Sequence, residues 1–236
     1  MTESGNLISR YAIYFSQKQE CDLFRLGSQW LGRNAIVGEN LDPALSNGLS
    51  REEWRTATDS PRRYGFHATL KPPFRLVQGT TYDELRSAVH NFAANYRSFE
   101  APPLTVGTLG RFIALTLSEP SAEFSDLAAA CVRTFHRFRA PATEEELAIR
   151  LRDTMNDQER EYLLRWGYPY VLDTWKFHMS LTGSLPKEKL SPLEKVLTQR
   201  FAPVCRQGFP VDSICIFREP APGNPFRLIE RADLRS

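Results

Sequence analysis

The sequence predicts an α+β fold made of two pseudo-symmetric lobes with a cleft between them. Two segments, residues 64–74 and 175–183, repeat the same order of an aromatic residue, a histidine, a hydroxyl residue and a leucine. Each segment is followed by a helical pattern and then by two short strands, so one strand–helix–hairpin unit occurs twice. A chain of 236 residues, 42% of them hydrophobic, is long and apolar enough for one large core. We therefore expect residues 1–236 to form a single bilobal domain with interleaved lobes.

The part of the chain before the first histidine segment is predicted to hold one strand and two helices. Alternating aromatic residues predict a strand over residues 10–15, and apolar residues at helical spacing predict a helix over residues 20–31. A polar stretch interrupted by Gly and Pro follows. Within it, Ser50 and Glu53 have the spacing of a capping box, which predicts a short helix near residues 50–56.

The first histidine segment is predicted to be a strand. Pro72 and Pro73 are expected to end its ladder because proline has no N–H to donate. Apolar spacing and two acidic residues in the first turn predict a helix over residues 81–96. Two alternating runs with Gly110 between them then predict a hairpin of strands over residues 104–109 and 112–117.

The remaining elements repeat this order around the second histidine segment. Apolar periodicity predicts helices over residues 125–138, 144–166 and 186–200. Gly and Pro in residues 167–170 end the second of these helices and lead into the second histidine strand. The last two strands are predicted over residues 211–218 and 226–232.

The two histidine strands should each bury one face and present a histidine beside a hydroxyl on the other. Side chains in a strand alternate between faces with period two. His67 and Thr69 therefore point away from their apolar neighbours Phe66, Ala68 and Leu70. The second strand has the same pattern, with His178 and Ser180 on one face and Phe177, Met179 and Leu181 on the other. Two matched copies favour a single site built from both strands.

Two facing histidines suit a reaction in which one proton is removed while another is delivered. Imidazole has a reference pKa of about 6.5, so near neutral pH one ring can be neutral and act as general base while the other is charged and acts as general acid. The hydroxyls of Thr69 and Ser180 can donate to non-bridging phosphate oxygens. This set predicts in-line displacement at phosphorus without a metal, and it does not say which histidine is the base.

Two lysines are predicted to support the same site. Lys71 follows Thr69 by two positions and Lys176 precedes His178 by two, so alternation places both on the faces of the histidines. There they could neutralise a phosphate. The structural alternative is that each is a solvated lysine at a strand end.

A metal site is the main rival use of the two histidines, and it needs a third ligand. Neither segment has an Asp, Glu or Cys beside its histidine on the same face, and His90 and His136 fall on predicted helices. No glycine-rich phosphate loop, nucleophile elbow or dinucleotide fingerprint is present. We expect no metal and no cofactor.

The composition favours a cytoplasmic protein. A formal net charge of +2 gives no broad field for nucleic acid, and the N-terminal residues lack the apolar core of a secretory signal. No run approaches the roughly 18 apolar residues that span a bilayer. Four scattered cysteines without a Cys-x-x-Cys pair are typical of reduced thiols. We expect a monomer that acts on a small molecule, without a membrane or nucleic-acid partner.

At the two histidine segments the sequence resembles the two-histidine (2H) phosphoesterase superfamily, whose members carry two His-x-[Ser/Thr]-x tetrads. Its closer likeness is to the branch associated with phosphonate metabolism and encoded beside carbon–phosphorus lyase genes. The stretches that carry this resemblance are RYAIYF, YGFHATLKPPF, FRAP, GYPYV and FHMSLTG, at residues 10–15, 64–74, 138–141, 167–171 and 177–183. Ser180 departs from the threonine more usual in the branch, and the superfamily accepts either hydroxyl.

The resemblance implies a bilobal fold with two antiparallel sheets lining a central cleft and helices outside. It also implies hydrolysis of a cyclic phosphate, and the breakdown of phosphonates supplies a specific one, 5-phosphoribosyl 1,2-cyclic phosphate. Further residues within the matching stretches are candidates to hold the sugar hydroxyls and the 5-phosphate, namely Tyr11, Tyr64, Lys71, Arg139 and Tyr168. The tyrosines could equally be packing residues, and Arg139 could merely complement the end of a helix.

Two other functions stay open. The first is a 2′,3′-cyclic nucleotide or RNA-end phosphodiesterase, which would need exposed aromatic residues and a cationic track. The second is a non-catalytic module that binds a phosphorylated ligand or RNA, although both histidines and both hydroxyls are present.

Overall fold

The structure is a computed structural model that describes residues 9–43, 45 and 49–236, so the expectation about the first eight residues lies outside the described part. Its largest sheet has the order β11-β10-β1-β4 and contains β1 (Arg10–Phe15), β4 (Ala68–Arg75), β10 (Ser213–Glu219) and β11 (Arg227–Asp233). A second sheet has the order β6-β7-β8 and contains β6 (Leu104–Leu109), β7 (Phe112–Leu117) and β8 (Met179–Ser180). All pairings in both sheets are antiparallel. The predicted α+β fold class is confirmed.

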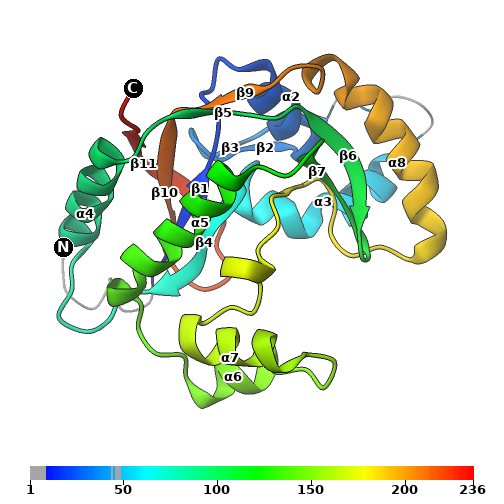
Figure 1. The fold of residues 1–236 in the computed structure, drawn as a ribbon. Helices are drawn as coiled ribbons and strands as arrows, with labels where there is room; N and C mark the ends of the chain where they lie inside the picture. The colour runs from blue at the N-terminus through cyan, green and yellow to red at the C-terminus, as the bar shows by residue number, and fades with distance from the viewer. Residues whose placement is uncertain (1–8, 44, 46–48) are drawn as a thin grey trace.

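Seven α-helices are found among the described residues: α2 (Asp22–Leu31), α3 (Arg51–Tyr64), α4 (Tyr82–Asn95), α5 (Ala122–Thr134), α6 (Glu144–Arg150), α7 (Asp157–Trp166) and α8 (Lys187–Phe201). Helices α4 and α5 lie against the larger sheet, α8 lies outside β6 and β7, and α6 and α7 form a separate pair below them (Figure 1). In the described part of the chain no helix is both long and apolar enough to cross a membrane.

The order of the elements repeats. The first unit runs β4, α4, β5 (Phe99–Ala101), β6 and β7, and the second runs β8, α8, β9 (Phe209–Val211), β10 and β11. The hairpin of each unit joins the sheet that holds the histidine strand of the other unit, and β5 pairs with β9. The histidine strands β4 and β8 are therefore both edge strands, each in a sheet completed by the other half of the chain.

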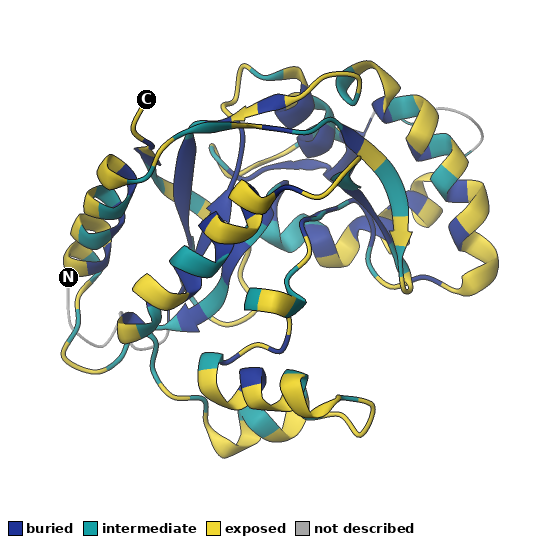
Figure 2. Cartoon of the chain, in the orientation of Figure 1, coloured by how far each residue is buried: buried dark blue, intermediate teal, exposed yellow. Residues whose placement is uncertain are grey.

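The two faces of the larger sheet have different neighbours. On β1, Tyr11, Ile13 and Phe15 belong to the main hydrophobic core, which includes the apolar faces of α4 and α5. Ala12 and Tyr14 belong to a smaller cluster on the opposite face, with Ala35, Cys215, Phe217 and Phe226. The centre of the sheet is buried on both faces, whereas α6 and α7 are mostly exposed (Figure 2).

Three sequence predictions about elements need correction. The helix expected near residues 50–56 extends to Tyr64, although its capping box of Ser50 and Glu53 is confirmed. The single helix expected over residues 144–166 is two helices, because Asn156 caps a new helix with its side chain. Strand β4 continues through Pro72 and Pro73, which an edge strand tolerates here because the register against β1 shifts between Lys71 and Phe74 and leaves both prolines without a paired residue. The structure also adds short strand pairs that the sequence did not indicate, including β2 (Arg33–Asn34) with β3 (Glu39–Asn40).

Candidate active site

Each histidine lies one residue before a strand, and the predicted alternation of side chains is confirmed there. His67 and Thr69 are half-buried, whereas Phe66, Ala68 and Leu70 are buried. In the second segment the same pattern holds, with half-buried His178 and Ser180 between buried Phe177, Met179 and Leu181.

The same backbone hydrogen bond orients both imidazoles. Nδ1 of His67 lies 2.9 Å from the carbonyl oxygen of Gly65, and Nδ1 of His178 lies 2.9 Å from the carbonyl oxygen of Lys176. A carbonyl can only accept, so Nδ1 carries the proton in each ring and Nε2 holds the lone pair of the neutral form. The Nε2 atom of His67 accepts from the Thr69 hydroxyl at 3.2 Å. Each histidine therefore offers Nε2 for proton transfer.

The contact to His67 depends on glycine at position 65. This residue ends α3 with φ = 81°, a conformation that residues with a Cβ rarely adopt. A Cβ there would also lie 2.4 Å from the Cβ of Ala35. Gly65 thus lets the chain turn sharply out of α3 and present its carbonyl to the ring two residues later.

Aromatic rings hold both imidazoles in place. The ring of Tyr14 stacks on His67 with centroids 3.7 Å apart and planes 17° apart. Phe217 lies 5.9 Å from the same histidine, and Phe112 meets His178 edge-on at 5.6 Å. These contacts restrict the imidazole rings and remove water from around them.

Both histidines are harder to protonate than a free imidazole. Burial lowers the pKa of His67 to about 4, partly opposed by the bond to Gly65, and the charge of His178 lowers it further. Burial likewise lowers the pKa of His178, and its bond to Lys176 opposes this. Because a charge on one ring disfavours a charge on the other, the two histidines belong to one electrostatic site.

The two histidine segments are also joined directly. The indole Nε1 of Trp175 donates to the backbone carbonyl of Thr69 at 2.8 Å, which connects the segment before β8 to the edge of β4. Trp175 packs beside Phe124 and Phe177 in the main core. The relative position of His67 and His178 is therefore fixed by a hydrogen bond between residues 106 positions apart.

Two of the predicted substrate-binding residues lie on the opposite face of the sheet. The prediction that Lys71 shares the face of His67 is wrong, because the register of β4 against β1 shifts between Thr69 and Lys71. Such a bulge turns Lys71 to the same side as Leu70, where it is 2% exposed and donates to the carbonyl of Val132. Tyr11 is also buried in the main core, stacked on Tyr82.

The other four candidates are nearer to the surface. Tyr64 stacks on Phe226 and its ring lies 6.5 Å from that of His67. Tyr168 is partly exposed, and together with burial and Tyr64 it raises the pKa of Tyr14. Arg139 binds the carbonyl oxygens of Ala140 and Arg165, whereas the Lys176 side chain is exposed. The roles of these residues stay predictions.

The sequence reasoning missed Tyr14, the residue in closest ring contact with His67. Alternation along the predicted strand places Tyr14 on the opposite face from Tyr11, but it does not say which of the two faces holds the histidines. It also missed an ion cluster on this face, where Arg10 and Arg63 both donate to the fully buried carboxylate of Glu219. Burial alone would raise the pKa of Glu219, but these two hydrogen bonds lower it below its usual range.

One known protein family matches more than half of the chain. Residues 69–227 match the model of a family described as a protein of unknown function (DUF1045); the match begins two residues after His67 and includes the second histidine segment. The chain belongs to this family.

Curated relatives and solved structures show further similarity. The chain is 37% identical over 227 residues to a protein of Janthinobacterium sp. (strain Marseille) named ribose 1,5-bisphosphate phosphokinase PhnN, covering 94% of this chain and 50% of that protein. A protein of the same name from Laribacter hongkongensis (strain HLHK9) is 32% identical over 224 residues, covering 93% and 50%. The chain thus spans about half the length of the curated relatives it matches.

Among solved structures, one described as a phosphoesterase aligns over 97% of this chain and 99% of its own, with 10% identity and a TM-score of 0.44. E. coli LigT complexed with 3′-AMP covers the same shares, with 12% identity and a TM-score of 0.43. Likeness at this level carries no argument about the activity of this chain.

Proposed function

We propose that the chain is a phosphoric diester hydrolase that opens a small cyclic phosphate by general acid–base catalysis with His67 and His178. The observation that supports this most strongly is that both rings are held through Nδ1 by a backbone carbonyl, which leaves Nε2 as the nitrogen for proton transfer in each ring of one electrostatic site.

In the proposed reaction, Nε2 of the neutral histidine takes a proton from water as the water oxygen attacks phosphorus. The bond from phosphorus to the ring oxygen opposite breaks, and this oxygen takes the proton from Nε2 of the charged histidine. Thr69 and Ser180 donate to the non-bridging oxygens, where negative charge gathers in the transition state. One water is consumed, and the diester becomes a monoester. No step requires a metal.

The best candidate substrate is 5-phosphoribosyl 1,2-cyclic phosphate, which the resemblance to the phosphonate branch suggests. The cyclic phosphate can open by hydrolysis of either of its two ring P–O bonds, and the names of the curated relatives favour one of them. Hydrolysis of the bond between phosphorus and O2 of this compound yields ribose 1,5-bisphosphate, the compound in the name of those longer proteins. We therefore propose that the O2–P bond breaks, and that a ribose 1,5-bisphosphate kinase consumes the product.

The test is to incubate EDTA-treated protein with 5-phosphoribosyl 1,2-cyclic phosphate and, separately, with a 2′,3′-cyclic nucleotide, following both by ³¹P NMR. We expect ring opening to ribose 1,5-bisphosphate without metal, with a loss of at least about 100-fold in both His67→Ala and His178→Ala. If only the nucleotide is hydrolysed, the substrate is instead a cyclic nucleotide or an RNA end. Variants that act and bind like the parent would refute the histidine mechanism.

A further inference from the structure

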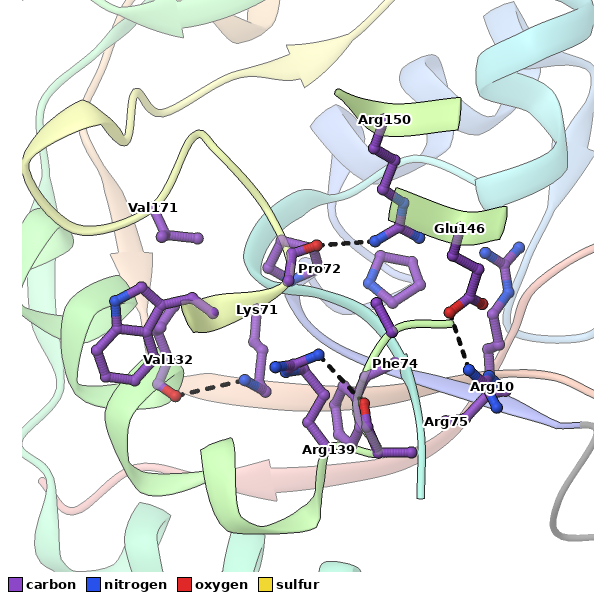
Figure 3. Close-up of a pocket in the computed structure, with 15 residues that line it drawn as sticks. Arg10, Lys71, Pro72, Phe74, Arg75, Val132, Arg139, Glu146, Arg150 and Val171 are labelled. Atoms are coloured by element: carbon purple, nitrogen blue, oxygen red, sulfur yellow. Dashed lines mark hydrogen bonds and ion pairs between the residues drawn. The ribbon is translucent and has the colours of Figure 1, made fainter. Parts of the chain in front are cut away.

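A polar cavity lies between the edge of β4 and the pair of helices α6 and α7 (Figure 3). Its volume is about 30 Å³. Its walls include five cationic side chains and one carboxylate, namely Arg10, Lys71, Arg75, Arg139, Arg150 and Glu146. This is a strong local excess of positive charge in a chain whose formal net charge is only +2.

Only part of this charge is neutralised. Arg75 forms an ion pair with Glu146 at 2.8 Å, and Arg10 is paired with Glu219. Among the described residues, Lys71, Arg139 and Arg150 form no ion pair with any carboxylate. They donate instead to backbone carbonyls, for example Lys71 to Val132 at 3.3 Å and Arg150 to Gly167 at 2.7 Å.

Two donors in the cavity wall are also buried without any partner in the described part of the chain, Arg139 Nε and Trp166 Nε1. A buried donor that makes no hydrogen bond is costly, and so is a buried charge that is not paired. Figure 3 shows the Lys71 amino group close to the Arg139 guanidinium, a contact that is repulsive on its own. Burial and Arg139 together lower the pKa of Lys71 to about 7. An anion in the cavity would relieve all of these unfavourable features.

The cavity adjoins the histidine face through two of its wall residues. Arg10 lies over the ring of Phe226, which stacks on Tyr64. Gly167 precedes Tyr168, which together with burial and Tyr64 raises the pKa of Tyr14, the ring stacked on His67. A ligand that reacts at the histidines can therefore place a second group toward this cavity.

We propose that the cavity binds a phosphate monoester group of the substrate, remote from the phosphorus that reacts at the histidines. A guanidinium group can donate two parallel hydrogen bonds to two oxygens of one phosphate. A doubly charged phosphate monoester also balances three cations that have no ion pair among the described residues better than a singly charged carboxylate does. This proposal rests on the proposed function. It makes the enzyme selective for cyclic phosphates that carry a second phosphate group.

The first part of the test measures binding alone, so it does not depend on the proposed reaction. Isothermal titration calorimetry is run with ribose 5-phosphate, inorganic phosphate and ribose on the full chain and on Lys71→Met and Arg139→Gln. The matched control is Lys195→Met, which removes an exposed lysine on α8. We expect both phosphates, but not ribose, to bind the parent and the control, and binding to weaken roughly 10- to 100-fold in each cavity variant. Absence of phosphate binding by the parent, or equal binding by the cavity variants, would overturn the proposal.

The second part asks whether the bound phosphate belongs to the substrate. The value of kcat/KM is compared for the ribosyl 1,2-cyclic phosphate with and without its 5-phosphate. We expect Lys71→Met and Arg139→Gln to reduce the preference of the parent for the 5-phosphorylated ring by roughly 10- to 100-fold, and the control Lys195→Met to keep that preference. A preference that survives in both variants while phosphate binding is lost would show that the cavity holds a separate anion, and would refute this assignment.

Discussion

A single hydrogen bond decides which nitrogen of each catalytic candidate is free. At His67 the acceptor is the carbonyl of Gly65, and at His178 it is the carbonyl of Lys176, both at 2.9 Å. The two acceptors lie two residues before their histidines, so the arrangement is local and recurs in both strands. It leaves Nε2 as the nitrogen for proton transfer in each ring, and in His67 this atom lies 3.2 Å from the Thr69 hydroxyl.

The lowered pKa values of this pair determine the expected pH dependence. Burial lowers the pKa of His67 to about 4 and that of His178 below its usual 6.5, so at neutral pH the free enzyme carries both rings uncharged. The active form carries one proton on the pair, and its population falls as the pH rises above the higher of the two values. We expect kcat/KM to peak below pH 6.5 and to fall about tenfold per pH unit above it.

The measurement is a profile of kcat/KM from pH 4 to pH 9 with the ribosyl ring that lacks the 5-phosphate, so that no substrate group titrates. His90→Asn is the control, because His90 is paired with Glu230 on α4 and β11, outside the site. Its profile should match that of the parent. A rate that keeps rising between pH 6 and pH 8 would contradict the acid–base assignment.

The alternation of side chains along a strand correctly predicted the faces on which the two histidines and the two hydroxyl residues lie, but it predicted the wrong face for Lys71. Alternation holds only while the ladder is regular, and the register of β1 against β4 shifts before this residue. A bulge depends on the partner strand, which a single sequence does not show. For the same reason the sequence did not distinguish Tyr11, which is in the main core, from Tyr14, which stacks on His67.

At the scale of elements, strands with clear alternation were predicted with their full length. The bounds of β1, β6 and β7 agree with the expected residues 10–15, 104–109 and 112–117. Elements whose ends depend on contacts with distant parts of the chain were not predicted with their full length. The α3 helix extends beyond its prediction through Pro61, and its buried residues include Trp54 and Ala57, which pack in the main core.

The hydrogen bond from Trp175 to the Thr69 carbonyl should matter to catalysis as well as to stability. Trp175→Phe leaves this carbonyl without its donor, and we expect the free energy of unfolding to fall by about 1–3 kcal/mol. Because the two histidine segments then lose their direct link, we also expect kcat to fall by about tenfold. Denaturant unfolding and steady-state kinetics measure the two effects.

Trp54→Phe is the matched control for this variant. It removes the same kind of bond, from the Trp54 indole to the Trp30 carbonyl at 2.6 Å, within the helical layer and outside the site. We expect a similar loss of stability with kcat unchanged. Equal losses of kcat in both variants would mean that Trp175 does not position the histidines.

At the scale of the whole molecule, the site exists because two halves of the chain exchange hairpins. The sheet of β4 is completed by β10 and β11 from the second half, and the sheet of β8 by β6 and β7 from the first. β4 pairs with β1 of its own half, but neither sheet is complete without strands from the other half. The repeat of one strand–helix–hairpin unit was visible in the sequence. The exchange was not, because periodicity identifies elements and does not say which strands pair.

The central claim is that His67 and His178 act in one step of one reaction, and a double-mutant cycle tests it most directly. Single-turnover rates of ring opening would be measured in EDTA for the parent, His67→Ala, His178→Ala and the double variant, with circular dichroism to confirm folding. If the residues act as a unit, we predict that the double variant is no more than about tenfold slower than the slower single variant. Losses that multiply, or one variant with the parent's rate, would contradict a two-histidine mechanism.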